Sequence, residues 1–245
     1  MLHKIFTPMA LAALAFVAVI AAGILAMTPA KADGWTGCYV GVAGGYASAL
    51  TNTSVTFGAL SANVDSLGAQ GGSVTGLLGC DMQVAPRIIL GVWGDYSKTN
   101  ADFSVNFSPV PAALISTGLD TSWALGARAG YIVVPNTMAY VLIGYGEADT
   151  KNISFPAFAL APPLSVPTLS GVVLGAGVEV ALGGGWYGQT QYKYTNYDSV
   201  SIPLWPGVGA PVLGLDTDVQ EVRLGLLFKF NTGDAANAFS PTPLK

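Results

Sequence analysis

Between Trp35 and Phe230 the sequence divides into eight segments of about ten residues, separated in strict alternation by long loops and short turns. Within each segment, alternate residues are apolar or small, and the residues between them carry the polar groups. This is the period of a β-strand. The pattern predicts an all-β fold, an eight-stranded antiparallel transmembrane β-barrel built as an up-and-down meander. One face of each strand would meet lipid, and the other would face the barrel interior.

The three short connections, at residues 85–87, 135–137 and 183–185, are rich in the Gly, Pro and Asn that tight turns require. We expect them in the periplasm, together with both chain termini, and the long loops outside the cell. The expected strands lie near residues 36–47, 73–84, 88–98, 122–133, 138–147, 170–181, 186–195 and 219–230. The long loops would then cover residues 48–72, 99–121, 148–169 and 196–218.

Aromatic residues gather at both ends of the expected strands, as in the interfacial girdles of membrane barrels. The periplasmic girdle would contain Trp35, Tyr131, Trp186, Phe228 and Phe230. The outer girdle would contain Tyr46, Tyr96, Trp123, Tyr145 and Tyr194.

The two ends of the chain differ from this barrel region. Residues 1–32 have the form of a cleaved signal peptide: His3 and Lys4 precede a long apolar run, and Ala30-Lys31-Ala32 is a small-x-small cleavage site. The apolar run is long enough to span a bilayer, so an uncleaved anchor helix is the alternative. Residues 33–230 would form the outer-membrane β-barrel, and residues 231–245 a flexible periplasmic tail.

Composition excludes several classes of function. Without the signal peptide the chain has eight basic and fourteen acidic residues, a net charge of −6, and no Lys/Arg cluster that would neutralise nucleic-acid phosphates. His3 is the only histidine, and it lies in the signal peptide. Imidazole general bases, Ser-His pairs and His-ligated zinc are therefore excluded, and we predict a protein that is not an enzyme and holds no cofactor or metal.

Eight charged residues share the parity of the polar face and should point into the barrel. Because an eight-stranded barrel is just wide enough for its side chains to fill, opposite charges there should pair and plug the lumen. A small polar pore is the alternative. The predicted lumen charge network consists of Asp81, Asp95, Arg128, Glu179, Lys193, Glu221, Arg223 and Lys229.

Two cysteines lie at the same height of the first predicted hairpin. Cys38 is near the start of the first strand and Cys80 near the end of the second, and both have the apolar parity of their strands. Export would place them where disulfides persist, so we expect a Cys38–Cys80 disulfide. The alternative is two unpaired cysteines that act as small, lipid-facing apolar residues.

Three of the four long loops are apolar and rich in proline, so they would expose apolar surface to water. Such surface is normally buried: either the loops pack on one another, or they contact lipid, an apolar solute or another protein. The candidate apolar surface consists of Leu114, Ile115, Phe155, Phe158, Leu160, Leu164, Leu204 and Trp205.

Several strand motifs resemble those of the small porin-like barrels known as outer membrane immunogenic proteins of Gram-negative bacteria. The resemblance covers nearly all of the mature chain and implies an eight-stranded barrel in the outer membrane, with diverse roles among its relatives. This chain departs from the family pattern in two places. It continues as a tail after Phe230, and it has Gln189 and Gln191 where relatives usually carry inward charges. The matching motifs are Trp35-Thr36-Gly37-Cys38-Tyr39-Val40-Gly41, Gly91-Val92-Trp93-Gly94-Asp95-Tyr96, Arg128-Ala129-Gly130-Tyr131, Gly175-Ala176-Gly177-Val178-Glu179, Val222-Arg223-Leu224-Gly225 and Lys229-Phe230.

These observations favour a non-enzymatic, porin-like surface protein with a structural or interaction role. Its partners would be outer-membrane lipid, the barrel-insertion machinery, and another protein or a second protomer bound through the apolar loops. One alternative is the binding or uptake of small hydrophobic molecules. The resemblance adds haem to these, although any axial ligand here would be Tyr, Met or Cys. The other alternative is a narrow diffusion pore.

Overall fold

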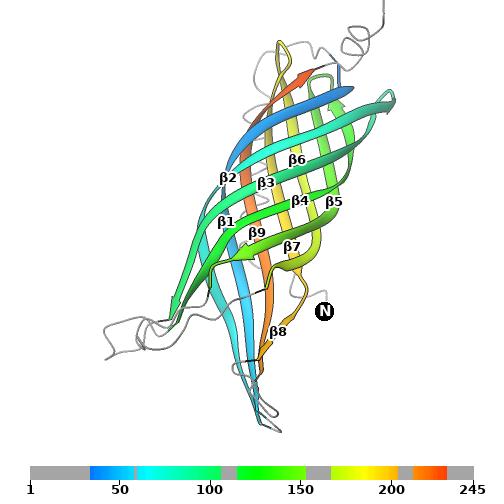
Figure 1. Ribbon diagram of the computed structural model, residues 1–245. Helices are drawn as coiled ribbons and strands as arrows, with labels where there is room; N and C mark the ends of the chain where they lie inside the picture. The colour runs from blue at the N-terminus through cyan, green and yellow to red at the C-terminus, as the bar shows by residue number, and fades with distance from the viewer. Residues whose placement is uncertain (1–33, 58–59, 106–114, 153–166, 204–211, 231–245) are drawn as a thin grey trace, which may run out of the picture.

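The computed structural model describes residues 34–57, 60–105, 115–152, 167–203 and 212–230, and their strands form one antiparallel sheet. The sheet closes because β1 pairs with both β2 and β9, so eight strands make a continuous wall (Figure 1). The predicted eight-stranded antiparallel barrel is confirmed. The strands are β1 (Gly37–Phe57), β2 (Leu60–Ala85), β3 (Ile88–Val105), β4 (Ile115–Val134), β5 (Thr137–Thr150), β6 (Leu169–Gly183), β7 (Trp186–Tyr197), β8 (Val200–Pro203) and β9 (Val212–Phe230).

Three two-residue turns lie at one end of the barrel, which we call the turn end. They are formed by residues 86–87, 135–136 and 184–185, within the short connections that the sequence predicts. Gly184 and Gly185 have φ angles of 59° and 80°, a left-handed conformation that glycine adopts without a steric penalty. The opposite end, where the long connections lie, is the loop end.

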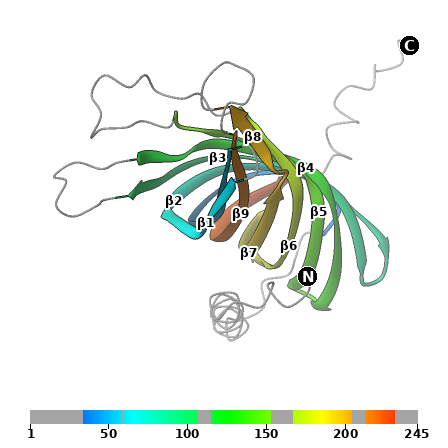
Figure 2. The same ribbon diagram turned by 90° about the horizontal axis from the view of Figure 1, so that it is seen from below.

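At the loop end the strands are longer than predicted. Most of the expected loop at residues 48–72 is strand, because β1 and β2 continue to pair as far as Phe57 and Leu60. β3 and β4 also continue to pair, as far as Val105 and Ile115. The hairpins β1–β2 and β3–β4 therefore project beyond the rest of the wall (Figures 1 and 2).

A further short strand lies within the expected loop at residues 196–218. This strand, β8, pairs with Val212–Leu215 of β9, beyond the last pair between β7 and β9. Thr and Val residues in the projecting part of β1, such as Thr51, Thr53 and Val55, favour extended backbone, which explains why pairing continues past the predicted end.

Side chains alternate between the two faces of the wall as the sequence predicts. On β3, Val92 and Tyr96 are exposed on the outer face, whereas Trp93 and Asp95 are buried inside. Trp35 corrects one expectation: it is only 4% exposed and lies inside the turn end, not in a girdle on the outer face. Its indole Nε1 donates to the carbonyl oxygen of Pro135 at 3.4 Å, and its ring packs against Tyr187. Among the described residues, no helix is long and apolar enough to cross a membrane.

Candidate functional site

The lumen near the turn end is filled by four charged side chains, Asp81, Arg128, Glu179 and Lys229, which we call the turn-end network. Arg128 pairs with Asp81, and with Glu179 at 3.2 Å. Lys229 pairs with the same two carboxylates, at 2.9 Å and 2.5 Å. The network therefore holds two acids and two bases, has no net charge, and braces β2, β4, β6 and β9 against one another across the lumen.

Aromatic rings surround the two cations of this network. The guanidinium carbon of Arg128 lies 4.5 Å from the ring centroid of Tyr39 and 5.3 Å from that of Tyr140. The Lys229 Nζ lies 4.7 Å from the Tyr187 ring and 5.0 Å from the Trp35 ring. Cation–π contacts of this kind stabilise a desolvated cation and leave little room for water beside it.

A second set of four charged side chains, Asp95, Lys193, Glu221 and Arg223, lies further toward the loop end and forms the loop-end network. Lys193 contacts Asp95 at 3.2 Å and Glu221 at 3.5 Å. Arg223 contacts the same two carboxylates, at 2.5 Å and 3.8 Å. The Ser73 hydroxyl donates to Glu221 at 2.6 Å. This network also has no net charge, and it joins β3, β7 and β9.

Two small spaces flank the loop-end network in the described part of the lumen. One, of about 10 Å³, is bordered by Arg128, Arg223 and Gln191 and separates the two networks. The other, of about 20 Å³, borders Lys193 and Glu221 on the loop-end side. Each has room for about one water molecule, so side chains fill most of the space beside the networks at these two heights.

Strand parity in the sequence predicts all eight charged residues, but it does not identify the glycines that make room for them. Gly91 pairs with Asp81 on one side and with Arg128 on the other. A Cβ atom at Gly91 would overlap the Asp81 carboxylate and lie 2.7 Å from the Cys80 carbonyl oxygen. Gly177 makes the same allowance for Tyr140, whose hydroxyl would lie 2.5 Å from an added Cβ. Such a glycine faces inward and lies directly opposite a large inward residue. It can be recognised in a sequence only when the strand register is known.

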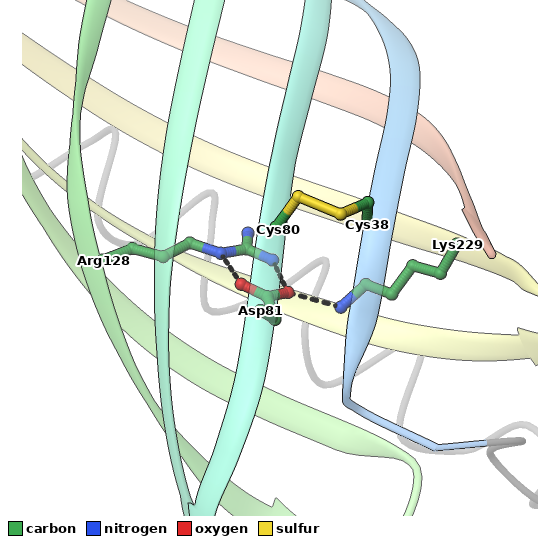
Figure 3. The surroundings of a disulfide bond; sticks show 5 residues. All are labelled: Cys38, Cys80, Asp81, Arg128 and Lys229. Carbon is green, nitrogen blue, oxygen red and sulfur yellow. Dashed lines mark hydrogen bonds and ion pairs between the residues drawn. A yellow bond between two sulfur atoms is a disulfide. The ribbon is translucent and has the colours of Figure 1, made fainter. Parts of the chain in front are cut away.

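Cys38 and Cys80 are joined by a disulfide, as the sequence predicts (Figure 3). They are direct partners in the β1–β2 ladder, and the bond lies on the outer face of the wall. The next residue of β2, Asp81, points to the opposite face and lies between Arg128 and Lys229 (Figure 3). The disulfide therefore fixes the register of the hairpin next to the turn-end network.

The predicted apolar loop surface lies outside the described residues, apart from the backbone of Ile115, which begins β4. Within the part of the chain that the structure describes, no group of three or more His, Cys, Asp or Glu residues could hold a metal ion. Within the described residues, the candidate site is therefore the lumen, and its chemistry is the pairing of opposite charges.

Residues 15–230 match the model of the outer membrane protein beta-barrel domain. The 31 kDa outer-membrane immunogenic protein of Brucella melitensis is 28% identical over 212 residues, covering 82% of this chain and 86% of that protein. Among solved structures, the outer membrane protein OprG from Pseudomonas aeruginosa has a TM-score of 0.54 at 13% identity. That match covers 83% of this chain and 98% of OprG.

The attachment invasion locus protein Ail of Yersinia pestis is a more distant structural match, with a TM-score of 0.41 at 16% identity, covering 80% of this chain and 99% of Ail. The match to the family model extends over most of the sequence, and the closed antiparallel wall with its apolar outer face is the architecture expected of its members. The chain therefore belongs to the outer membrane protein beta-barrel domain family and sits in the lipid of a Gram-negative outer membrane.

Proposed function

We propose that this protein is a non-conducting, non-enzymatic barrel that anchors a surface for interaction with another protein or a second protomer. The observation that carries the proposal is the filled lumen. Two ion-pair networks without net charge occupy it at two heights, and the spaces beside them are water-sized. Taking one partner out of such a buried pair is unfavourable by about 3–5 kcal/mol, so the networks resist transient opening.

The loop end supports an interaction role. The projecting hairpins β1–β2 and β3–β4, with the β8–β9 pair, form a hydrogen-bonded frame beyond the closed wall. In this proposal the turn end faces the periplasm, the frame faces outside the cell, and the Pro-rich apolar segments that contain Phe158 and Trp205 dock the partner. Exposed apolar surface of this kind is typical of sites that bind other molecules.

Conductance tests the closed lumen. Protein comprising residues 33–245 is folded into planar lipid bilayers, and its folding is verified by the change in electrophoretic mobility on heating. An open porin in the same bilayers shows that single channels can be detected. We expect no unitary current from the folded protein. Steady current steps would overturn the proposal and make small-solute diffusion the function.

Docking is tested separately. The triple variant Phe158→Ser, Leu160→Ser and Trp205→Ser should lose any co-purifying partner or oligomer, while it keeps the heat-modifiable mobility of the folded barrel. The control replaces Val74, Val141 and Val172 on the outer wall with Leu, which keeps those positions apolar. A size profile that is identical for the wild type and the triple variant would contradict docking through these loops.

One observation favours a second candidate, the capture of small hydrophobic molecules beneath the loops. Ala49, Leu119, Leu169 and Tyr197 belong to a buried apolar cluster inside the loop end, which would form an apolar floor under the long connections. In that case the fluorescence of Trp205 should change saturably with an apolar ligand, including haem. The absence of any saturable response across a varied ligand panel would exclude this candidate.

A further inference from the structure

Side chains do not cover the outer face of the wall evenly over β1–β4. One pairing row crosses these four strands: Val40 faces Leu78, Leu78 faces Gly94, and Gly94 faces Leu125. On either side of this row lies an apolar groove, and both grooves share these four residues. The loop-end groove has a volume of about 450 Å³ and the turn-end groove about 350 Å³.

Glycine residues create these grooves, because two outward positions carry no side chain. A Cβ built at Gly76 meets nothing closer than the Tyr96 carbonyl oxygen at 4.0 Å, and one at Gly94 meets its nearest neighbours at 3.6 Å. The side chains around them protrude: Leu78 is 62% exposed and Leu125 is 55% exposed. The result is a depression bordered by leucine, valine and aromatic side chains.

The corresponding outward positions on β5 are filled. Ala139, Val141, Ile143 and Tyr145 follow one another there without a glycine. The grooves therefore do not continue onto β5.

The dimensions of the grooves fit a hydrocarbon chain. Four strands about 4.8 Å apart give each groove a length of about 14 Å along the pairing row. Because the strands of a membrane barrel are tilted by about 35–45°, this row is inclined to the bilayer normal, and a chain seated along it would lie obliquely across the wall. Rows two residues apart on a strand are separated by about 7 Å, a width that one flexible chain can fill. The broad convex wall of a second barrel would pass over such a depression without filling it.

One end of the loop-end groove is aromatic. Tyr96 and Trp123 are direct partners on β3 and β4, and both border this groove. Trp123 is held in place by an edge-on contact with Tyr145, with ring centroids 6.0 Å apart. Tyr and Trp concentrate at the level of lipid headgroups, so a lipid chain would enter this groove from its headgroup end beside Trp123.

We propose that the outer wall over β1–β4 is a binding site for acyl chains of bilayer lipids, with the loop-end groove as its principal subsite. Lipid tails are as apolar as leucine, so apolarity alone does not distinguish one part of the wall from another. Shape does: an acyl chain seated over Gly76 and Gly94 makes van der Waals contacts on several sides, whereas a chain on the filled wall makes them on one side. The site rests on the membrane location of the barrel and not on the proposed docking role.

The test compares glycines that face outward on neighbouring strands. Gly76→Leu fills the loop-end groove, whereas Gly44→Leu is the matched control, because Gly44 has open space around its Cβ position and does not border either groove. Each protein is folded into vesicles of palmitoyl-chain phosphatidylethanolamine and phosphatidylglycerol, extracted into detergent and analysed by native mass spectrometry. Heat-modifiable mobility verifies the fold of each variant before extraction.

We expect wild-type protein and the Gly44→Leu variant to retain phospholipid equally. Retention by Gly76→Leu should fall about fivefold or more, because the added leucine takes the place of the tens of atomic contacts that a seated chain would make. Equal retention by the wild type and Gly76→Leu, an equal loss in both variants, or no retained phospholipid at all would overturn the proposal. So would a bound free fatty acid or a second protein chain in place of phospholipid.

Discussion

Single residues decide how closely charges approach inside this barrel. Gly91 lies between Asp81 and Arg128 in the sheet, and its missing side chain lets two residues on strands β2 and β4 meet across β3. Each base of the turn-end network contacts both acids, so the charges balance within a group of four and not pair by pair. Removing one member leaves an excess charge in a place that water barely reaches.

Arg128→Met tests this balance. The variant keeps an apolar stem of similar length but leaves Asp81 and Glu179 with only Lys229, so the free energy of unfolding should fall by about 3–5 kcal/mol. Urea titration in lipid vesicles, followed by tryptophan fluorescence, measures the change. Adding Asp81→Asn restores a network without net charge, and the double variant should be more stable than Arg128→Met alone. If the stability losses of the two single variants simply added in the double variant, the charge balance would be contradicted. Lys98→Met removes a positive charge at an exposed site and is the control for charge removal alone.

Gly91→Ala tests the space between the two charges. Its Cβ would overlap the Asp81 carboxylate and push it from Arg128, so we expect a loss of about 1–3 kcal/mol, as for an overpacked core site. Gly44→Ala makes the same chemical change on the outer face, where nothing lies within 4 Å of the added atom. The same urea titration compares the two. Equal stabilities for the two variants would show that Gly91 is not needed for space.

At the scale of the strand, the alternation of side chains in the sequence predicted which face of the wall each residue occupies, but it did not predict the length of each strand. A period of two residues assigned the inward charges and the outward cysteines, because alternate side chains must point to opposite faces. It did not locate the strand ends at Phe57 and Leu60, since pairing there depends on the partner strand and not on an alternating apolar pattern. Trp35 was misplaced because it precedes β1, where the chain turns into the lumen and the girdle pattern no longer applies.

The hairpin β1–β2 provides a prediction at this scale. The disulfide closes a separation of 42 residues, so Cys38→Ser should lower the free energy of unfolding by about 2–4 kcal/mol. Cys80→Ser and the double variant should show the same loss, because each removes the same bond. Thermal unfolding with and without a reducing agent measures it. A further loss on adding reductant to Cys38→Ser would mean that the reductant acts on something other than this bond.

At the scale of the whole molecule, closure depends on the last residues of β9. Leu226–Phe230 pair with Cys38–Val42 of β1, and Lys229 in this segment belongs to the turn-end network. The sequence showed that a final strand should end at Phe230, but not which side chains would meet across the lumen. Those contacts join β2, β4, β6 and β9, which lie far apart in the chain, and their pairing requires the barrel to be closed.

Truncation separates the strand from the segment that follows it. A chain ending at Phe230 should fold into vesicles with the same yield as the full chain, because β9 and its pairing with β1 are complete. A chain ending at Gly225 loses five ladder pairs with β1 together with Lys229, and should not close. The fraction with heat-modifiable mobility measures folding in each case. Folding of the shorter chain would show that closure does not need this part of β9.

The two networks also bear on how a barrel of this kind can change over evolutionary time. Because they lie at different heights and share no residue, a substitution that dismantles one leaves the other in place. For the closed barrel proposed above, evolution toward an open channel would first produce variants that are less stable but still closed. Natural selection would act against the loss of stability before any new permeability arose. In the closed barrel that we propose, the two networks together protect the closed lumen against gradual loss, and opening would require changes in both groups of four.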